Sequence, residues 1–215
     1  MARRFHLIIP IALLFLAYGY WGRWISHPAA SLNILGVDLA EYVKFVPEAR
    51  YGVISINRLF FFASPVSLAL GLILFASLRS PIKVWLRVMA GLLVIPTSLS
   101  MLPPAWTPGL LMSPEFRTQT LLILALLGIM VLIPLWKYLL PDWLRGGLLI
   151  ILGLLPFLAL SSFFRIMPAL ARLYHRPLHP AAGVYALMIG MTLITLSGLL
   201  MLYAALKERY ISSQD

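Results

Sequence analysis

Three histidines are the residues of this sequence best suited to metal or haem chemistry. His27 and His179 each begin the same tetrapeptide, His-Pro-Ala-Ala, and His175 precedes the second copy by four residues. Imidazole nitrogens are common metal ligands, so these three residues are secondary candidates for a metal site. However, Pro177 breaks the helix that an i, i+4 ligand pair needs, and histidine–proline pairs are also typical of turns. We therefore predict neither a metal nor a cofactor.

A second candidate site consists of charged and aromatic residues in two connecting segments. Carboxylates and cations could act as acids, bases or phosphate clamps, or equally form helix caps and salt bridges. The sequence contains no nucleophile elbow, phosphate loop or HExxH motif, so it favours a binding face over a catalytic centre. The residues predicted for this partner or substrate face are Asp38, Glu41, Tyr42, Lys44, Phe45, Glu48, Arg50, Glu115 and Arg117.

The composition places these residues on a membrane protein. Of 215 residues, 61% are hydrophobic and only 11% are charged, whereas a soluble domain is about half apolar and a quarter charged. A water-soluble globule is therefore excluded. The absence of cysteine also excludes disulfides and thiolate metal sites.

The basic excess points to lipid rather than nucleic acid. The net charge is +10, from 17 Lys and Arg against 7 Asp and Glu. These cations fall between the apolar runs and form no basic stripe or recognition motif. Lysine and arginine beside a membrane segment bind anionic headgroups. We therefore expect membrane lipids as partners and no nucleic acid.

Six apolar segments could position the candidate sites. A spanning helix needs about 20 mainly apolar residues, and runs of this length favour helices over the shorter strands of barrels. We predict an all-α, polytopic integral membrane protein with about six transmembrane helices in a single domain, residues 1–215. The expected spans are residues 5–25, 59–78, 88–102, 118–139, 146–164 and 183–206.

The connection after the first span is the least membrane-like part of the chain. Within this external loop, residues 27–57, residues 37–46 form an amphipathic pattern typical of a short surface helix. Asp38 and Glu41 have the spacing of a capping box, and Pro47 would end the helix. We expect this helix to lie along the membrane surface or to pack over the mouth of the bundle.

Basic residues favour an orientation with both termini in the cytoplasm. Arg79, Lys83 and Arg87 occupy one short loop without an acid, and such loops are typical of the cytoplasmic side. The predicted location is the inner (cytoplasmic) membrane of a prokaryotic cell. The aromatic residues expected to anchor the first span at the interface are Tyr18, Tyr20, Trp21 and Trp24.

Small residues at helical spacing predict two packing faces. Close approach of two helices in a membrane needs such residues. The second span has Ala63, Ser67 and Gly71 on one face, and the sixth has Ala186, Gly190 and Gly198. The spacing leaves open whether each face contacts another helix of this chain or a partner chain.

The functional prediction follows from small size, the lack of a catalytic motif and the lack of ionisable residues deep inside the spans. Ion-coupled carriers ordinarily place such residues at membrane depth. The leading hypothesis is a non-enzymatic integral membrane subunit, a permease-like or accessory component of a multi-protein transport assembly, with other membrane subunits as partners. One alternative is a membrane enzyme acting on a lipid or amphiphile at the outer face. Another is a haem- or metal-binding redox subunit.

Overall fold

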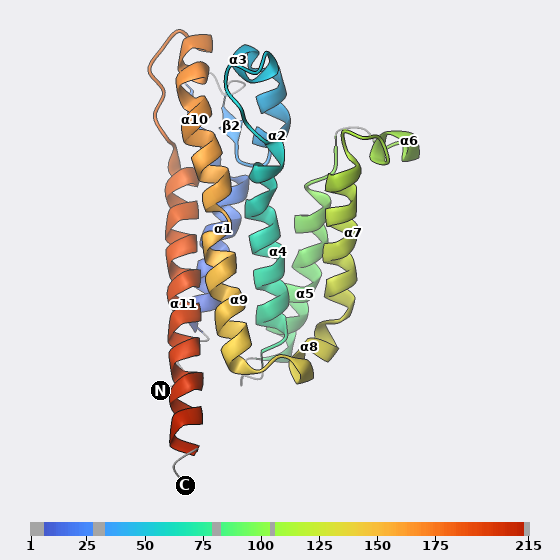
Figure 1. The fold of residues 1–215 in the computed structure, drawn as a ribbon, viewed down its shortest axis with the longest axis vertical. Coiled ribbons are helices and arrows are strands. Elements are labelled where there is room, and N and C mark those ends of the chain that lie inside the picture. Colours follow the sequence, from blue (N-terminus) through green and yellow to red (C-terminus); the bar gives the residue numbers. More distant parts are fainter. Residues whose placement is uncertain (1–6, 28–32, 79–82, 104–105, 213–215) are drawn as a thin grey trace.

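The chain folds into a bundle of helices aligned along one axis (Figure 1). The structure is a computed structural model, and it describes residues 7–27, 33–78, 83–103 and 106–212. The helices are α1 (Ile8–Trp21), α2 (Leu39–Tyr42), the 3₁₀ helix η3 (Val43–Phe45), α3 (Pro47–Arg50), the 3₁₀ helix η4 (Arg58–Phe62), α4 (Ala63–Ala76), α5 (Val84–Leu99), α6 (Pro108–Leu111), α7 (Arg117–Val131), α8 (Ile133–Leu139), α9 (Asp142–Leu154), α10 (Phe157–Leu173) and α11 (Ala182–Ser212).

Among the described residues, three helical segments are long and apolar enough to cross a membrane. They are Arg58–Ala76, Asp142–Leu173 and Ala182–Arg209. A fourth is possible if α7 and α8, which meet at a bend of 67°, form one broken span. At 1.5 Å per residue, α1 and α5 extend about 21 and about 24 Å, short of a hydrocarbon core of about 30 Å. The all-α membrane class therefore fits the structure, with three such helices or up to four.

Helix α4 forms the centre of the bundle. All of its residues except Val66 and Leu70 are buried, and it packs against α1, α5, α7 and α9. Its sequence is apolar on every side, which is typical of a helix surrounded by other helices. Around this centre, α11 packs between α1 and α9.

The predicted fourth span, residues 118–139, is divided at Leu132. Pro134 occupies the first turn of α8 and has no N–H to continue the hydrogen-bond ladder of α7. The hydropathy of the segment does not change at this point, so the apolar run alone predicts one straight helix.

The predicted fifth span, residues 146–164, corresponds to a longer pair of helices. α9 begins at Asp142 and α10 continues to Leu173, with Pro156 between them. The last turns of α10 therefore extend beyond the predicted span, and Pro168 is accommodated inside the helix. A helix that leaves a membrane keeps its own hydrogen bonds, so a drop in hydropathy does not mark its end.

Short elements gather at the end of the bundle where α10 terminates (Figure 1). β1 (Arg23–Ile25) pairs antiparallel with β2 (Ile34–Leu35), and a single bridge joins Ile25 to Pro180. We call β1, β2, α2, η3, α3 and the residues 51–57 that follow them the lobe. The sequence did not indicate the two strands, because each is only two or three residues long.

Two of the four predicted interface anchors are instead core residues. Trp24 and Tyr20 are 1% and 2% exposed. The Trp24 indole donates to the Gly19 carbonyl at 2.7 Å and packs edge-on against Phe163. Tyr18 and Trp21 are exposed. Trp24 therefore joins the lobe to α1 and α10 rather than facing lipid.

Candidate functional site

The lobe is tied to the bundle by one cluster of charged residues. Glu41 accepts a hydrogen bond from Lys44 Nζ at 2.5 Å and another from Arg58 Nη1 at 3.0 Å. Lys44 Nζ also donates to Glu115 Oε1 at 2.6 Å, and Arg58 donates to the Glu115 carbonyl. Both cations lie over the ring of Phe116. We call these five residues the cation–carboxylate cluster.

The cluster joins three segments that are distant in the sequence. Lys44 belongs to η3, Arg58 begins η4, and Glu115 lies in the turn before α7. The hydrogen bond from Lys44 holds the pKa of Glu115 below its ordinary value. Glu115 is therefore ionised at neutral pH, which suits a structural ion pair and does not suit a general acid.

A second set of contacts joins the lobe to the end of α10. Arg172 donates to Glu48 Oε1 from Nε at 3.1 Å and from Nη2 at 2.9 Å. The hydroxyl groups of Tyr42 and Tyr174 lie 3.2 Å apart. The backbone N–H of Glu48 and the Arg172 guanidinium both lower the pKa of the Glu48 carboxyl. The lobe is thus bound to two separate parts of the bundle.

The predicted cap of the surface helix does not form. The Asp38 side chain makes no capping hydrogen bond, and Glu41 binds cations instead of turning back to Asp38. Burial raises the pKa of Asp38. The predicted helix, residues 37–46, is also two elements, α2 and η3, that end at Phe45. Pro47 does not only end this helix, since it occupies the first turn of α3.

A cavity of about 530 Å³ opens beside the cluster. Its walls include Val43, Lys44, Ala49, Arg50, Asn57 and Arg58. Arg50 makes no ion pair with any residue in the described part of the chain. Lys44 and Arg58, which the cluster holds in place, also line the cavity. Three cations therefore border it.

The remaining residues of the predicted face do not join the cluster. Phe45 is 75% exposed. Arg117 is exposed at the start of α7 and forms no ion pair within the described ranges. Of the predicted face, Glu41, Lys44 and Glu115 therefore belong to the cluster, whereas Phe45 and Arg117 lie outside it.

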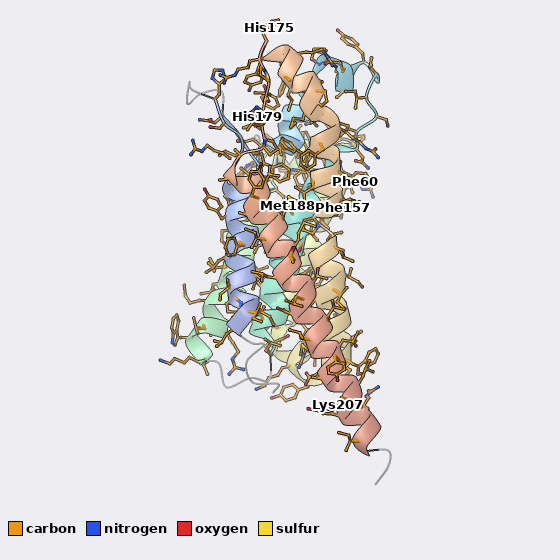
Figure 2. The ribbon with its side chains drawn as sticks, turned by 90° about the vertical axis from the view of Figure 1, so that its left-hand side faces the viewer. Phe60, Phe157, His175, His179, Met188 and Lys207 are labelled. Carbon is orange, nitrogen blue, oxygen red and sulfur yellow. The ribbon has the colours of Figure 1, made fainter. Side chains whose placement is uncertain are left out.

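The three histidines occupy separate environments. The His27 ring packs near Tyr174, with 5.7 Å between centroids, whereas His175 and His179 lie at different heights along the long axis (Figure 2). No group of three potential ligands among the described residues could hold a metal ion. His175 has a positive φ of 50°. It ends α10 in a Schellman motif, in which Arg176 N–H donates to Ala171 and His175 N–H donates to Arg172.

The predicted packing faces lie against other helices of the same chain. A Cβ built on Gly190 would lie 2.8 Å from the Leu16 backbone nitrogen, and one on Gly198 would lie 2.7 Å from the Gly146 carbonyl oxygen. On α4, the hydroxyl of Ser67 donates to the Leu152 carbonyl at 2.6 Å. A Cβ on Gly71 would meet the Leu13 side chain. Ala63 and Ala186, the other predicted members, are both buried.

Arg145 is a buried structural residue that was not among the predicted site residues. It is 1% exposed, and its guanidinium binds Asp142 Oδ1 at 2.7 Å. It also donates to the carbonyls of Trp136 and Lys137 at 3.3 and 3.0 Å. Both carbonyls lie near the end of α8, where Pro141 has no N–H to offer the Lys137 carbonyl. Arg145 therefore joins α9 to the bent helix, a role that its neighbours in sequence do not reveal.

Gln119 is a second such residue. It is 1% exposed in the first turn of α7, and its amide donates to the Met101 carbonyl. The adjacent Thr120 donates to the Leu111 carbonyl at 2.8 Å. These bonds join the start of α7 to the end of α5 and to α6. In the sequence, the one sign of this role is an amide residue just inside the predicted span 118–139.

Comparison with known proteins yields no relative. No family model matches the chain, and no curated protein or solved structure matches it.

Proposed function

We propose that this chain is a non-enzymatic integral membrane subunit that binds partner membrane subunits through its lobe. The observation that carries the proposal is the exposure of three large apolar side chains on the lobe, outside the long helices. Phe45, Tyr51 and Val53 are 75%, 77% and 76% exposed. Exposed apolar side chains are expected where helices face lipid. Three of them within residues 45–53 of the lobe, which this proposal places outside the membrane, favour an interaction site there.

The attachment of the lobe supports this role. The cation–carboxylate cluster holds η3 against η4 and the start of α7, and the bond between Glu48 and Arg172 holds α3 against α10. Binding loops commonly work from such a rigid scaffold. The small-residue faces of α4 and α11 contact helices of the same chain, which favours the lobe over these faces as the partner surface.

In this proposal the chain crosses the membrane six times. The passes are α1, η4 with α4, α5, α7 with α8, α9 with α10, and α11. Each is apolar, and apart from α8, which bends away from α7, they lie along one axis (Figure 1). The short helices α1 and α5 would cross together with the residues next to them. The lobe would then face outward, and both termini would be cytoplasmic.

The wider setting that we propose is a transport assembly in a prokaryotic cytoplasmic membrane. The support is the lack of ionisable residues deep in the predicted spans. The basic residues Lys83 and Arg87 precede and begin α5 without a neighbouring acid, which favours a cytoplasmic position for that end. Arg79, the third basic residue of this loop, lies outside the described residues.

Partner binding can be tested by combining Phe45→Ser, Tyr51→Ser and Val53→Ser. Partner chains that co-purify with the tagged wild type from its native membrane should decrease by at least about tenfold, because apolar anchors carry most of the energy of an interface. Ile211→Ser, which changes an exposed apolar residue on α11, should retain them. Photo-crosslinking groups at positions 45 and 53 should form protein adducts.

Two results would contradict the proposal. The triple variant would retain its partners at the wild-type level, or the crosslinks would form with lipid alone. Insertion and thermal unfolding of the variant should match the wild type, since the three changed side chains are exposed.

A further inference from the structure

We infer that the cavity beside the cation–carboxylate cluster binds a phosphate group at the membrane surface. This inference concerns a different part of the lobe and does not require the partner proposed above. It rests on an open cavity at the surface of the lobe that is lined by three cations and one amide. Two of the cations are held in ion pairs, and the third forms none among the described residues.

The cavity has the size of a ligand site. Its volume of about 530 Å³ lies within the range of about 300–1,000 Å³ typical of small-molecule sites. It is larger than a phosphate ion needs, so a phosphate that carries a glycerol or similar group would also fit. Asn57 and Arg58, which border the cavity, immediately precede the apolar run that starts α4. The site thus adjoins the expected level of lipid headgroups.

Two of the cations are fixed in position before a ligand arrives. Lys44 and Arg58 are held by Glu41 and Glu115, and both lie against the Phe116 ring. Lys44 uses two of three N–H donors in these ion pairs, and Arg58 has five donors in total. Preorganised donors bind an anion at a lower cost in side-chain entropy.

Arg50 provides the charge that the acids of the cluster do not balance. It lies on α3 at the wall of the cavity and forms no ion pair in the part of the chain that the structure describes. A guanidinium matches two phosphate oxygens with paired N–H donors. Arg50 is therefore the residue assigned to bind the phosphate directly.

Asn57, which lines the cavity, adds a neutral donor. Its Oδ1 accepts from Leu59 N–H at 3.0 Å and caps η4. This bond directs the oxygen to the backbone and leaves the amide N–H groups for a ligand oxygen. Asn57→Asp preserves the capping oxygen and adds a negative charge, so it tests the site without removing the cap.

The test uses the full chain in nanodiscs of phosphatidylcholine. Inorganic phosphate is titrated in one arm, and in the other phosphatidylglycerol is added to the discs and its retention is measured by native mass spectrometry. Arg50→Gln should weaken binding by at least about tenfold, as expected for the loss of a charge-assisted bond. Arg50→Lys should weaken it less, and Asn57→Asp should abolish it.

Arg176→Gln is the matched control. It removes the same charge from an exposed position after α10, outside the cavity, and should leave binding unchanged. Binding of phosphatidylglycerol alone identifies a lipid headgroup as the source of the phosphate, and binding of both probes identifies a site that also accepts the free ion.

The inference fails if neither probe binds the wild type. It also fails if Arg176→Gln weakens binding as much as Arg50→Gln. The loss of binding would then result from the lower positive charge of the surface and not from the cavity. Thermal unfolding of Arg50→Gln should match the wild type, since Arg50 has no ion-pair partner among the described residues to lose. If Arg50→Gln unfolds, Asn57→Asp serves as the test instead, and unchanged binding by that variant would overturn the inference.

Discussion

The charged residues of the lobe act mainly as connections. Glu41 bridges Lys44 and Arg58, and Lys44 continues to Glu115, so charges of opposite sign alternate. A single exposed ion pair contributes only about 0.2–1 kcal/mol. The shared ring of Phe116 adds a cation–π contact to both cations. The cluster therefore mainly orients the lobe and contributes little to the free energy of unfolding.

His175 illustrates how backbone geometry can explain a residue that looks chemical. Its φ of 50° places it in the left-handed region at the end of α10. This region costs most residues about 1–2 kcal/mol and is the usual position of glycine in a helix-ending motif. The backbone conformation of His175 is therefore explained by its place at the end of α10, without a chemical role for the imidazole.

We predict that His175→Gly raises the free energy of unfolding by about 1 kcal/mol, because glycine adopts a positive φ without strain. His175→Val should lower it, since a branched side chain is strained there. Thermal unfolding of the purified variants measures both effects. The control His179→Gly removes an imidazole from a residue without a positive φ and should bring no gain. A loss of stability in His175→Gly would contradict the capping role.

At the scale of elements, α11 holds the bundle together through close contacts on two sides. Gly190 faces the backbone of α1, and Gly198 faces Gly146 at the start of α9. Helices in a membrane gain little from burial of apolar surface and depend on close packing. A side chain at either glycine would separate two helices.

We predict that Gly190→Ala lowers the free energy of unfolding by about 1–3 kcal/mol, the usual cost of overpacking. Gly128→Ala is the matched control, because a Cβ at Gly128 on α7 would meet nothing within 4 Å. There the replacement should raise stability by about 0.5–1 kcal/mol through helix propensity. Equal effects of the two variants on thermal unfolding would refute the packing of α1 against α11.

The helices show which structural features a single sequence reveals. Spacing identified Gly190 and Gly198, but it could not identify Gly146 opposite, because that contact joins different helices. Hydropathy located α7 but not its bend, since Leu132 and Ile133 continue the apolar run across the break. The far end of α10 was missed for the opposite reason, because the helix persists after the hydropathy falls.

At the scale of the whole molecule, the start of α1 and the end of α11 lie at the end opposite the lobe (Figure 1). Lys207 near the end of α11 and His175 mark these two ends (Figure 2). Composition predicted a membrane protein, and the lengths of the apolar runs predicted that it is helical. The assembly of the lobe could not be predicted, because Lys44 and Glu115 are 71 residues apart and Glu48 and Arg172 are 124 apart.

Cysteine accessibility most directly tests the proposed arrangement, in which the bundle crosses the membrane six times and the lobe lies outside. The chain has no cysteine, so single cysteines can be placed at Tyr51, Lys83, Trp106 and Glu208 without a background. A membrane-impermeant thiol reagent applied to intact cells should label positions 51 and 106. Positions 83 and 208 should react only after the membrane is permeabilised. If position 106 were protected together with 83, α5 would not cross the membrane, and if 51 and 208 were labelled from the same side, the six-pass arrangement would be wrong.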